Sequence, residues 1–422
     1  MAVTPIELAR RLKAARENCG ITQKQVADAL GCSRTAVVQI EAGKRSVNSL
    51  ELDRMARMYG RGVAEFVSDD AFEDDPVVAL FRSTPGVAED SQLGAELRRC
   101  ANLCREATNL EQLLGRPCGG AVAEVSYSIK SPSTKWDAIC QGRMLAEQER
   151  NRLGLGNSPA WEIAEIIRNQ GVRVSEYSMP NDISGLFLHG RELGLIIVVN
   201  KDHPRNRRLF SYAHEYCHVL ADRQWTGAVT RSANREELVE IRANAFAAYF
   251  LMPAAGVHGF MQALGKGEVT RQMVEVFDDS VVSEHAEQIL VQKRMPPGSQ
   301  TVHVHDVVRM AHHFGVSYEA ALYQLRNLKL IQIDRFDALM AQREVGGKIG
   351  KALGIKSWDA DAHWSLTDQI LALGLEAYRR EGISRRKLLE LANGVDVARE
   401  DLEEILDANG DDEPAVGVVM PE

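Results

Sequence analysis

The strongest constraint on this 422-residue chain is the pentapeptide His214-Glu215-Tyr216-Cys217-His218. Residues four apart lie one turn apart on the same face of a helix, so both imidazoles can bind one ion. Glu215 lies beside them, where it can act as a general base on a water molecule. Apolar positions of the segment fall on the opposite side at about 100° per residue. We therefore expect one face in a core and the other presenting His214, Glu215 and His218 to a cleft, the alternative being a helix with two surface histidines.

A catalytic zinc site needs a third protein ligand from elsewhere in the chain. Position 224 is Gln, which excludes the class of zinc site that places a histidine six residues beyond the second one. The next predicted helix, 234–251, offers Glu240. Glu236 and Glu237 are rivals near the helix start, where acidic residues are common because they complement the helix dipole. The alternative for Glu240 is an ordinary exposed helix residue.

Glu240 shares its helix face with Ala243, Asn244 and Ala247. The two alanines would let this helix approach the His214 helix closely, so that Glu240 reaches the same ion. Asn244, one turn further on, would then contact one of the residues that bind the metal without binding the metal itself. Four residues are candidates for stabilising an oxyanion, and each also has a structural explanation: His189, Tyr212, Tyr249 and His258.

Residues 1–66 show the pattern of five short helices, including a helix, a turn and a capped helix at the spacing of a helix-turn-helix. Thr22 with Gln25 begins the second helix, and Ser33 caps the third. The segment contains 11 Lys and Arg against 7 Asp and Glu, whereas the whole chain has a net charge of −9. A basic module on an acidic protein indicates that this module meets phosphate. A small bundle that binds protein is the alternative.

The third helix has a polar outer side. Arg34, Thr35, Val38 and Gln39 fan across the side opposite the apolar positions. Arg and Gln side chains suit the edges of guanine and adenine, and a valine can contact the methyl group of thymine. This helix is therefore the predicted recognition helix.

The N-terminal segment resembles the XRE family of phage-repressor-like DNA-binding domains over about residues 5–66. The resemblance runs through the stretches 20–27 and 33–45. It implies a homodimer on palindromic double-stranded DNA. The residues that it would place against DNA are Gln23, Ser33, Arg34, Thr35 and Gln39, with Lys44 and Arg45 on phosphate.

Three short apolar runs bounded by turn residues predict a small sheet just before the His214 helix. These runs are 171–177, 183–188 and 195–199, and predicted helices at 135–153 and 159–169 precede them.

The stretch from about 140 to 255 resembles the ImmA/IrrE family of zinc metallopeptidases. The matching motifs, in order, are Ile183-Ser184-Gly185, Ile196 to Asn200, Arg208 to Glu215, and Glu240 to Ala247 continuing through Leu251-Met252-Pro253. Four motifs in the expected order are more specific than the pentapeptide alone. Tyr216-Cys217 stands where family members often carry Leu-Gly, which changes packing but not the ligands.

This second resemblance implies a thermolysin-like, gluzincin site. His214, His218 and Glu240 would bind Zn²⁺, with Glu215 as the catalytic base and Asn244 outside the ligands. Some family members cleave a repressor protein and so release stress or mobile-element genes.

Two other groups of residue types invite a metal interpretation. Cys100 and Cys104 lie one helical turn apart, but no further Cys or His is nearby, which favours thiols that pack between helices. The histidines at 303, 305, 312 and 313 have no i, i+4 pair on one helix, so we expect no second metal site there.

The predicted class is mainly α with a small β-sheet, an α+β fold. Its expected parts are a five-helix helix-turn-helix bundle (1–67), an acidic linker and helical connector (68–134), a metallopeptidase domain (135–255), a helical module resembling a helix-turn-helix (256–345), C-terminal helices (346–408) and a disordered tail (409–422). The chain contains no run of 18 or more apolar residues, so we expect no membrane span. Seven scattered cysteines without a C-x-x-C pair favour a reducing, cytoplasmic location.

Together these features favour a DNA-binding regulator whose zinc endopeptidase domain cleaves a partner repressor or another copy of itself. One alternative is a transcription factor whose peptidase-like domain is a sensor or dimerisation module and cuts nothing. Another is the antitoxin of a toxin–antitoxin pair.

Overall fold

The computed structural model confirms the mainly helical α+β class. The residues that it describes are 3–18, 21–59, 63–67, 91–116, 125–190, 193–223, 227–231, 234–266, 271–276, 289–294, 299–352, 366–395, 397, 398, 400, 402, 403 and 406. The predicted acidic linker after residue 67 and the predicted tail at 409–422 lie outside them. No described helix is both long enough and apolar enough to span a membrane.

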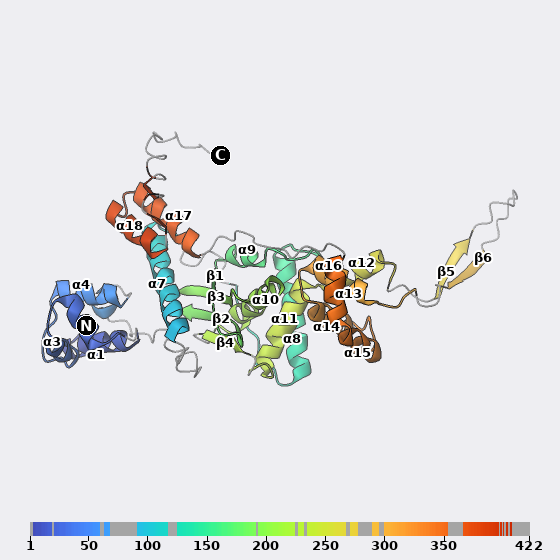
Figure 1. The fold of residues 1–422 in the computed structure, drawn as a ribbon, viewed down its shortest axis with the longest axis horizontal. Coiled ribbons are helices and arrows are strands. Elements are labelled where there is room, and N and C mark those ends of the chain that lie inside the picture. Colours follow the sequence, from blue (N-terminus) through green and yellow to red (C-terminus); the bar gives the residue numbers. More distant parts are fainter. Residues whose placement is uncertain are drawn as a thin grey trace.

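The N-terminal region forms the five expected helices (Figure 1). They are α1 (Pro5–Asn18), α2 (Gln23–Leu30), α3 (Arg34–Glu41), α4 (Ser49–Met58) and α5 (Val63–Val67). Thr22 and Gln25 make the predicted capping box, and the Ser33 hydroxyl accepts from the amide of Ala36. A buried ion pair, with Arg16 Nε 2.5 Å from Glu41 Oε1, joins α1 to α3. Local capping and one long-range pair therefore fix the orientation of the recognition helix.

A four-stranded sheet lies at the centre of the molecule. Its strands are β1 (Arg173–Tyr177), β2 (Ile183–Gly190), β3 (Gly194–Asn200) and β4 (Gly227–Arg231), in the order β1-β3-β2-β4. β1 is parallel to β3, and the other two pairings are antiparallel. The three predicted strands are confirmed. β4 was not predicted, because five residues after a turn give little alternation to detect.

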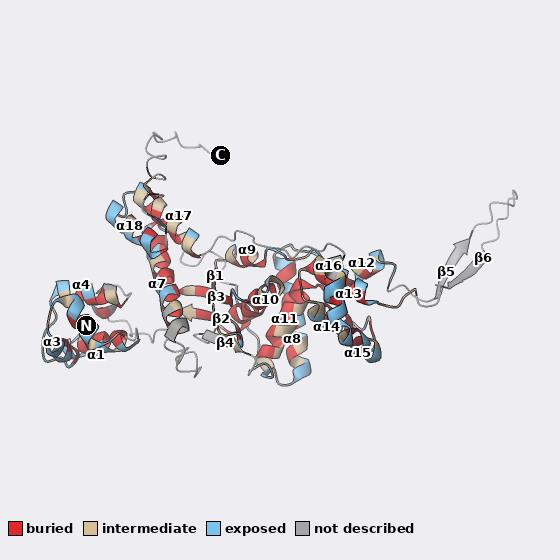
Figure 2. Cartoon of the chain, viewed as in Figure 1, coloured by how far each residue is buried: buried red, intermediate tan, exposed pale blue. Residues whose placement is uncertain are grey.

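Strands β2 and β3 are buried on both faces, which explains their nearly continuous apolar runs (Figure 2). Alternate residues enter two different cores: Phe187 and Ile197 face one, and Leu186 and Val198 face the other. The first core also holds side chains of α8 (Lys135–Arg152), α9 (Ile163–Arg168), α10 (Arg205–Ala221) and α11 (Leu238–Leu251). The second holds side chains of α7 (Ser91–Leu113) and α17 (Leu366–Arg379).

Two predicted helices are shorter than expected. α9 begins at Ile163 rather than 159, and α11 begins at Leu238 rather than 234. Residues 159–162 and 234–237 lie outside the helices, mostly in turns. Neither helix has a side-chain cap that would mark its start in the sequence.

The C-terminal half is not purely helical. A hairpin of β5 (Arg271–Val276) and β6 (Ile289–Arg294) lies in the region where only helices were expected. The helices are α12 (Ala254–Ala263), α13 (Val304–Phe314), α14 (Tyr318–Asn327), α15 (Ile333–Ala341), α16 (Arg343–Ala352) and α18 (Arg385–Gly394). The core around α10 continues into α13, α14 and α15, so a single core crosses the boundary predicted at 255. The domain limits themselves stay predictions.

Candidate metal centre and nucleic-acid interface

The predicted metal-binding pentapeptide lies on α10 and is buried. Every side chain from Ser211 to Ala221 is buried, including His214, Glu215 and His218. The alternative of a helix with two surface histidines is therefore wrong. The reason is tertiary: β2 and β3 contact α10, and α11 also packs against it. The ring of Phe187 on β2 stacks on the His218 ring at a centroid distance of 5.8 Å.

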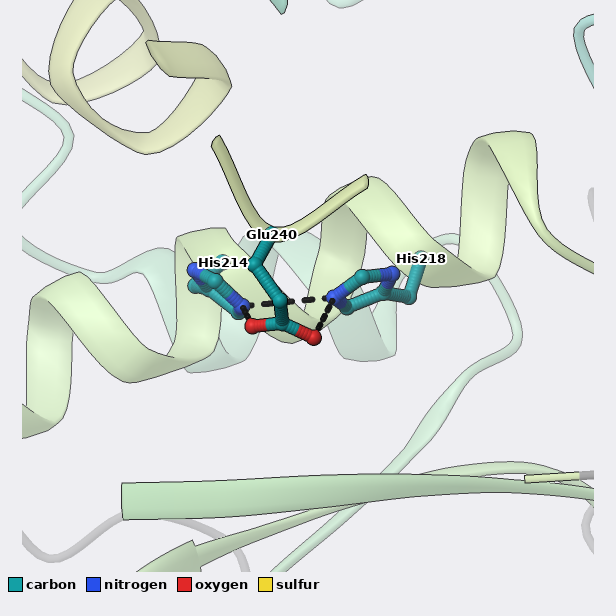
Figure 3. A group of neighbouring side chains, drawn as sticks. All are labelled: His214, His218 and Glu240. Atoms are coloured by element: carbon teal, nitrogen blue, oxygen red, sulfur yellow. Dashed lines mark hydrogen bonds and ion pairs between the residues drawn. The ribbon is translucent and has the colours of Figure 1, made fainter. Parts of the chain in front are cut away.

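His214, His218 and Glu240 converge between α10 and α11 (Figure 3). Their ligand atoms all lie within 4.8 Å of one another. Nε2 of His214 is 3.1 Å from Glu240 Oε2 and 3.2 Å from Nε2 of His218, which is 3.6 Å from Glu240 Oε1. Across the described parts of the chain, no other set of three His, Cys, Asp or Glu side chains forms such a group. The structure thus brings together the three residues chosen from the sequence as ligands.

The rival ligands lie elsewhere. Glu236 pairs with Lys135 at 2.5 Å, and its side chain is 79 % exposed. Glu237 is exposed and immediately precedes the first residue of α11. Glu240 alone of the three is buried and contacts both histidines.

Each histidine is oriented by a hydrogen bond from its other ring nitrogen. Nδ1 of His214 donates to Asn244 Oδ1 at 3.1 Å, the contact expected of Asn244. Nδ1 of His218 donates to Asp222 Oδ2 at 2.8 Å. These bonds place the proton on Nδ1 and leave the Nε2 lone pairs directed at the shared centre.

The sequence reasoning missed Asp222 and Arg242. Asp222 is buried beside Arg242, whose guanidinium nitrogen lies 2.5 Å from both of its carboxylate oxygens. The guanidinium counterbalances the carboxylate, and the pair links the end of α10 to α11. A sequence signal existed for Asp222, because it lies four residues after His218 and so on the same helix face. Arg242 had none, since a basic residue in a helix is ordinarily solvated.

Glu215 lies on α10 with His214 and His218 and is fully buried. Neither of its carboxylate oxygens has a hydrogen-bond partner of good geometry among the described residues, although the Thr230 hydroxyl lies near enough to lower its pKa. Burial raises the pKa of the carboxyl, although the nearby His214 and His218 oppose the shift. Gly185 on β2 makes room for it, because a Cβ there would lie 3.0 Å from Glu215 Oε1. An unpaired buried carboxylate with a raised pKa is suited to accepting a proton.

Close helix packing holds this arrangement. Ala243 and Ala247 on α11 are completely buried, as their small size suggested. The tightest approach is between α8 and α11: a Cβ on Gly142 would lie 2.8 Å from Ala245 Cβ and closer still to the carbonyl oxygen of Arg242. Gly142 therefore sets how near the Glu240 helix lies to its neighbour.

Tyr216, inside the pentapeptide, gives the unusual Tyr-Cys pair a structural role. Its hydroxyl donates to Glu149 Oε1 on α8 at 2.5 Å, and Tyr127 donates to the other oxygen at 2.9 Å. Arg152 bonds the same carboxylate. Burial would raise the pKa of Glu149, but these donors lower it. The tyrosine thus links α10 to α8 through a charged acceptor.

The structure engages most oxyanion candidates in other contacts. Tyr212 donates to Glu176 at 3.0 Å, and His189 bonds the carbonyl of Arg223 at 3.2 Å. The ring of Tyr249 lies under the guanidinium of Arg143. His258 is an exposed residue of α12. Three of the four candidates, Tyr212, His189 and Tyr249, therefore make contacts that give them a structural role.

The predicted DNA-facing residues divide into two groups. On α3, Arg34, Thr35 and Gln39 are exposed, as is Val38. Lys44 just after the helix is also exposed. These side chains are available to a partner.

The remaining predicted contacts are already used within the domain. Gln23 donates to Glu41 at 2.9 Å, and Arg45 pairs with Glu51 at 2.7 Å. The Ser33 hydroxyl caps α3. These groups hold the domain together as well as lying near its recognition face.

Comparison with known families finds a match in each of the two regions that contain these residues. Residues 167–277 match the peptidase-family model described as an IrrE N-terminal-like domain, and residues 7–66 match a helix-turn-helix domain. The chain joins these two domains. The predicted fusion is confirmed, and the first match runs from the end of α9 to just beyond β5, past the predicted limit at 255. A search of curated proteins finds no match.

Proposed function

We propose that the chain is a DNA-binding regulator whose IrrE-like domain is a zinc-dependent endopeptidase. The observation that carries this proposal is the meeting of His214, His218 and Glu240 beside the unpaired carboxylate of Glu215. Two imidazoles and one carboxylate are the ligand set of thermolysin-like zinc sites.

The dimensions of the group fit a zinc ion. Ligand atoms about 2.1 Å from a tetrahedral centre are about 3.4 Å apart. The three separations between ligand atoms here are 3.1, 3.2 and 3.6 Å. His214, His218 and Glu240 would hold the metal, and Asn244 and Asp222 would orient the two imidazoles.

Glu215 would carry the proton transfers of peptide hydrolysis. When bound, zinc supplies Lewis acidity toward a carbonyl oxygen and a water molecule. Glu215 accepts the proton of the attacking water and later donates it to the nitrogen of the leaving amine. Its raised pKa favours the first of these steps, because a carboxylate with a low pKa holds a proton poorly.

The helix-turn-helix domain would direct this activity to gene regulation in the cytoplasm. Arg34, Thr35 and Gln39 would read bases of a palindromic operator, while Lys44 contacts phosphate. The protein substrate would be a partner repressor or a second copy of the chain.

The test is cleavage of candidate repressors by the full chain. Glu215→Gln should abolish cleavage while zinc content and operator binding stay as in wild type. Glu236→Gln is the matched control, because Glu236 is exposed and away from the ligands. If Glu215→Gln cleaves as fast as Glu236→Gln, the assignment of Glu215 as the base is wrong.

A second candidate function rests on burial. His214, His218 and Glu240 are only 2, 0 and 3 % exposed, which suits a metal-dependent switch that binds DNA and cuts nothing. In that case removing zinc changes operator affinity, and Glu215→Gln behaves as wild type in every regulatory assay.

A further inference from the structure

The metal site is closed in this structure, although peptide hydrolysis needs a substrate chain beside Glu215. The side chains of His214, Glu215, His218 and Glu240 are all buried. A peptide carbonyl must come within reach of the water molecule that the general base activates. A part of the chain that covers the site must therefore move before a substrate can bind.

Strand β2 borders the catalytic carboxylate. A Cβ on Gly185 would lie 3.0 Å from Oε1 of Glu215, and the ring of Phe187 stacks on His218. β3 pairs with one edge of β2, which leaves the other edge for a further strand. Extended peptides bind proteins by adding a strand to such an edge, where main-chain hydrogen bonds provide the affinity. This second edge of β2 is therefore suited to an extended substrate.

β4 already occupies the second edge of β2 (Figure 1). It runs antiparallel to β2, with Thr230 opposite Gly185 and Ala228 opposite Phe187. Thr230 is thus level with the residue that borders Glu215. The hydroxyl oxygen of Thr230 is buried and has no hydrogen-bond partner of good geometry among the described residues. A buried polar atom without a partner costs stability, so β4 fits this position imperfectly.

The pairing of β4 with β2 is short and irregular. β4 has five residues, and β2 is its one neighbour among the described strands. The register shifts between Ile183 and Gly185, which leaves Ser184 without a partner residue on β4 in the described sheet. Such a shift interrupts the ladder of hydrogen bonds. Short edge strands with an interrupted ladder open locally at low cost in free energy.

We propose that β4 is a built-in inhibitory strand, which takes the place of an extended substrate on β2 and keeps the metal site closed until it detaches. This proposal rests on the peptidase function proposed above. Once β4 has left, an extended segment of the target protein pairs with β2 in the direction that β4 now takes. That pairing brings a peptide carbonyl to Glu215. A strand that were a permanent wall of the site would instead stay in place during function.

The experiment compares two double variants of the zinc-loaded full chain. Ala228→Pro with Val229→Pro removes two successive amide donors from β4. Successive residues of a strand direct their N–H groups to opposite sides, so one of the two lost donors faces β2. The matched control is Ala228→Val with Val229→Ala, which exchanges the two side chains and keeps both amides. Circular dichroism checks that both variants are folded.

Two readouts follow the opening of β4. Loss of zinc to excess EDTA should be at least about 10-fold faster in the proline variant than in the control, because one hydrogen bond fewer opposes detachment. Cleavage of fluorescein-labelled casein, used as an unfolded probe chain, should rise by a similar factor. Adding Glu215→Gln to the proline variant should abolish the cleavage and leave the fast loss of zinc.

Hydrogen exchange of the wild-type chain provides a measurement that needs no variant. The amides of β4 should exchange at least about 100-fold faster than those of β3, which is paired with β1 and β2 on its two sides. Equal protection of β4 and β3 would overturn the proposal, because β4 would then open only together with the whole sheet.

Failure of this proposal is distinguishable from failure of the peptidase function. Equal zinc loss and equal casein cleavage in the proline variant and its control overturn the inhibitory strand, and the peptidase function stands if both variants cleave casein. Fast zinc loss from a proline variant that cleaves nothing shows that β4 covers the metal site. That result overturns the peptidase function and, with it, the inhibitory role of β4.

Discussion

The recognition helix α3 and the metal-centre helix α10 contrast in how they are built. The side chain of Ser33 caps the start of α3, and this helix presents Arg34, Thr35 and Gln39 to solvent. α10 has no side-chain cap and is buried from Ser211 to Ala221. The first is specified by residues close in the sequence. The second depends on strands and helices that surround it on every side.

This difference predicts which property a substitution in each helix should change. Exposed side chains on α3 make few contacts within the domain, so replacing them should change DNA binding and leave stability nearly intact. Side chains around α10 take part in buried networks, so replacing them should affect metal binding and folding together.

The largest effect is expected at Asp222. Asp222→Ala leaves the guanidinium of Arg242 buried without its carboxylate and should lower the free energy of unfolding by about 3–5 kcal/mol. It should also weaken zinc binding about 10–100-fold, because His218 loses the acceptor that orients it. Urea unfolding of the zinc-free chain and competition with a chelator measure the two losses.

Asp222→Asn separates these two losses, since it keeps an acceptor for His218 but removes the charge. Its zinc affinity should be closer to wild type than that of Asp222→Ala, whereas its loss of stability should remain large. An Asp222→Ala chain with wild-type stability would mean that the metal-centre helix is no more dependent on its surroundings than α3.

The next effect is a pH dependence at Glu149. Burial would raise its pKa, but bonds from Arg152, Tyr216 and Tyr127 lower it below the ordinary 4.5. A carboxylate with a depressed pKa in the folded state stabilises the fold above the unfolded-state pKa, and this contribution is lost as pH falls through the folded-state pKa.

Wild type should therefore lose stability as the pH drops below about 4.5, and Glu149→Gln should lose less over that range. At pH 7 the variant should be less stable by about 1.5–3 kcal/mol, the contribution of hydrogen bonds to a charged group. Urea unfolding between pH 3 and pH 7 measures both. Parallel pH profiles for the two proteins would show that Glu149 does not titrate as described.

A third prediction concerns Gly142. Gly142→Ala forces a methyl group against the backbone of α11 and should cost about 1–3 kcal/mol of stability. The shift of α11 should also weaken zinc binding, because Glu240 moves with it. Gly259→Ala on α12 is the control, since a Cβ there meets nothing within 4 Å. Equal melting temperatures for the two variants would contradict the close packing.

The smallest effect on stability is expected on the recognition face. Arg34→Ala should weaken specific DNA binding by about 1–3 kcal/mol if the side chain reads a base, with no change in unfolding. Lys44→Ala should weaken binding to all sequences and reduce the salt slope by about 1. Fluorescence anisotropy over a range of salt concentrations distinguishes the two. A uniform loss for Arg34→Ala would reassign it to phosphate.

The parts of the fold that follow from local patterns were predictable. The caps at Thr22 and Ser33 located the helices of the N-terminal domain, and apolar runs located three strands. The structure also brings the three predicted ligands together, because helical spacing places two of them and a shared helix face selects the third. β4 and the β5–β6 hairpin escaped prediction, since short strands without strong alternation resemble loops.

The sequence by itself determined the ligand types, their spacing along α10 and the order of the two domains. Only the tertiary structure decided that the site is buried, that Asp222 and Arg242 support it, and that α8 and α11 meet at Gly142. The physical reason is that spacing along a helix fixes which side chains share a face. What covers that face depends on strands and helices distant in the chain, and their packing is not encoded in any single segment.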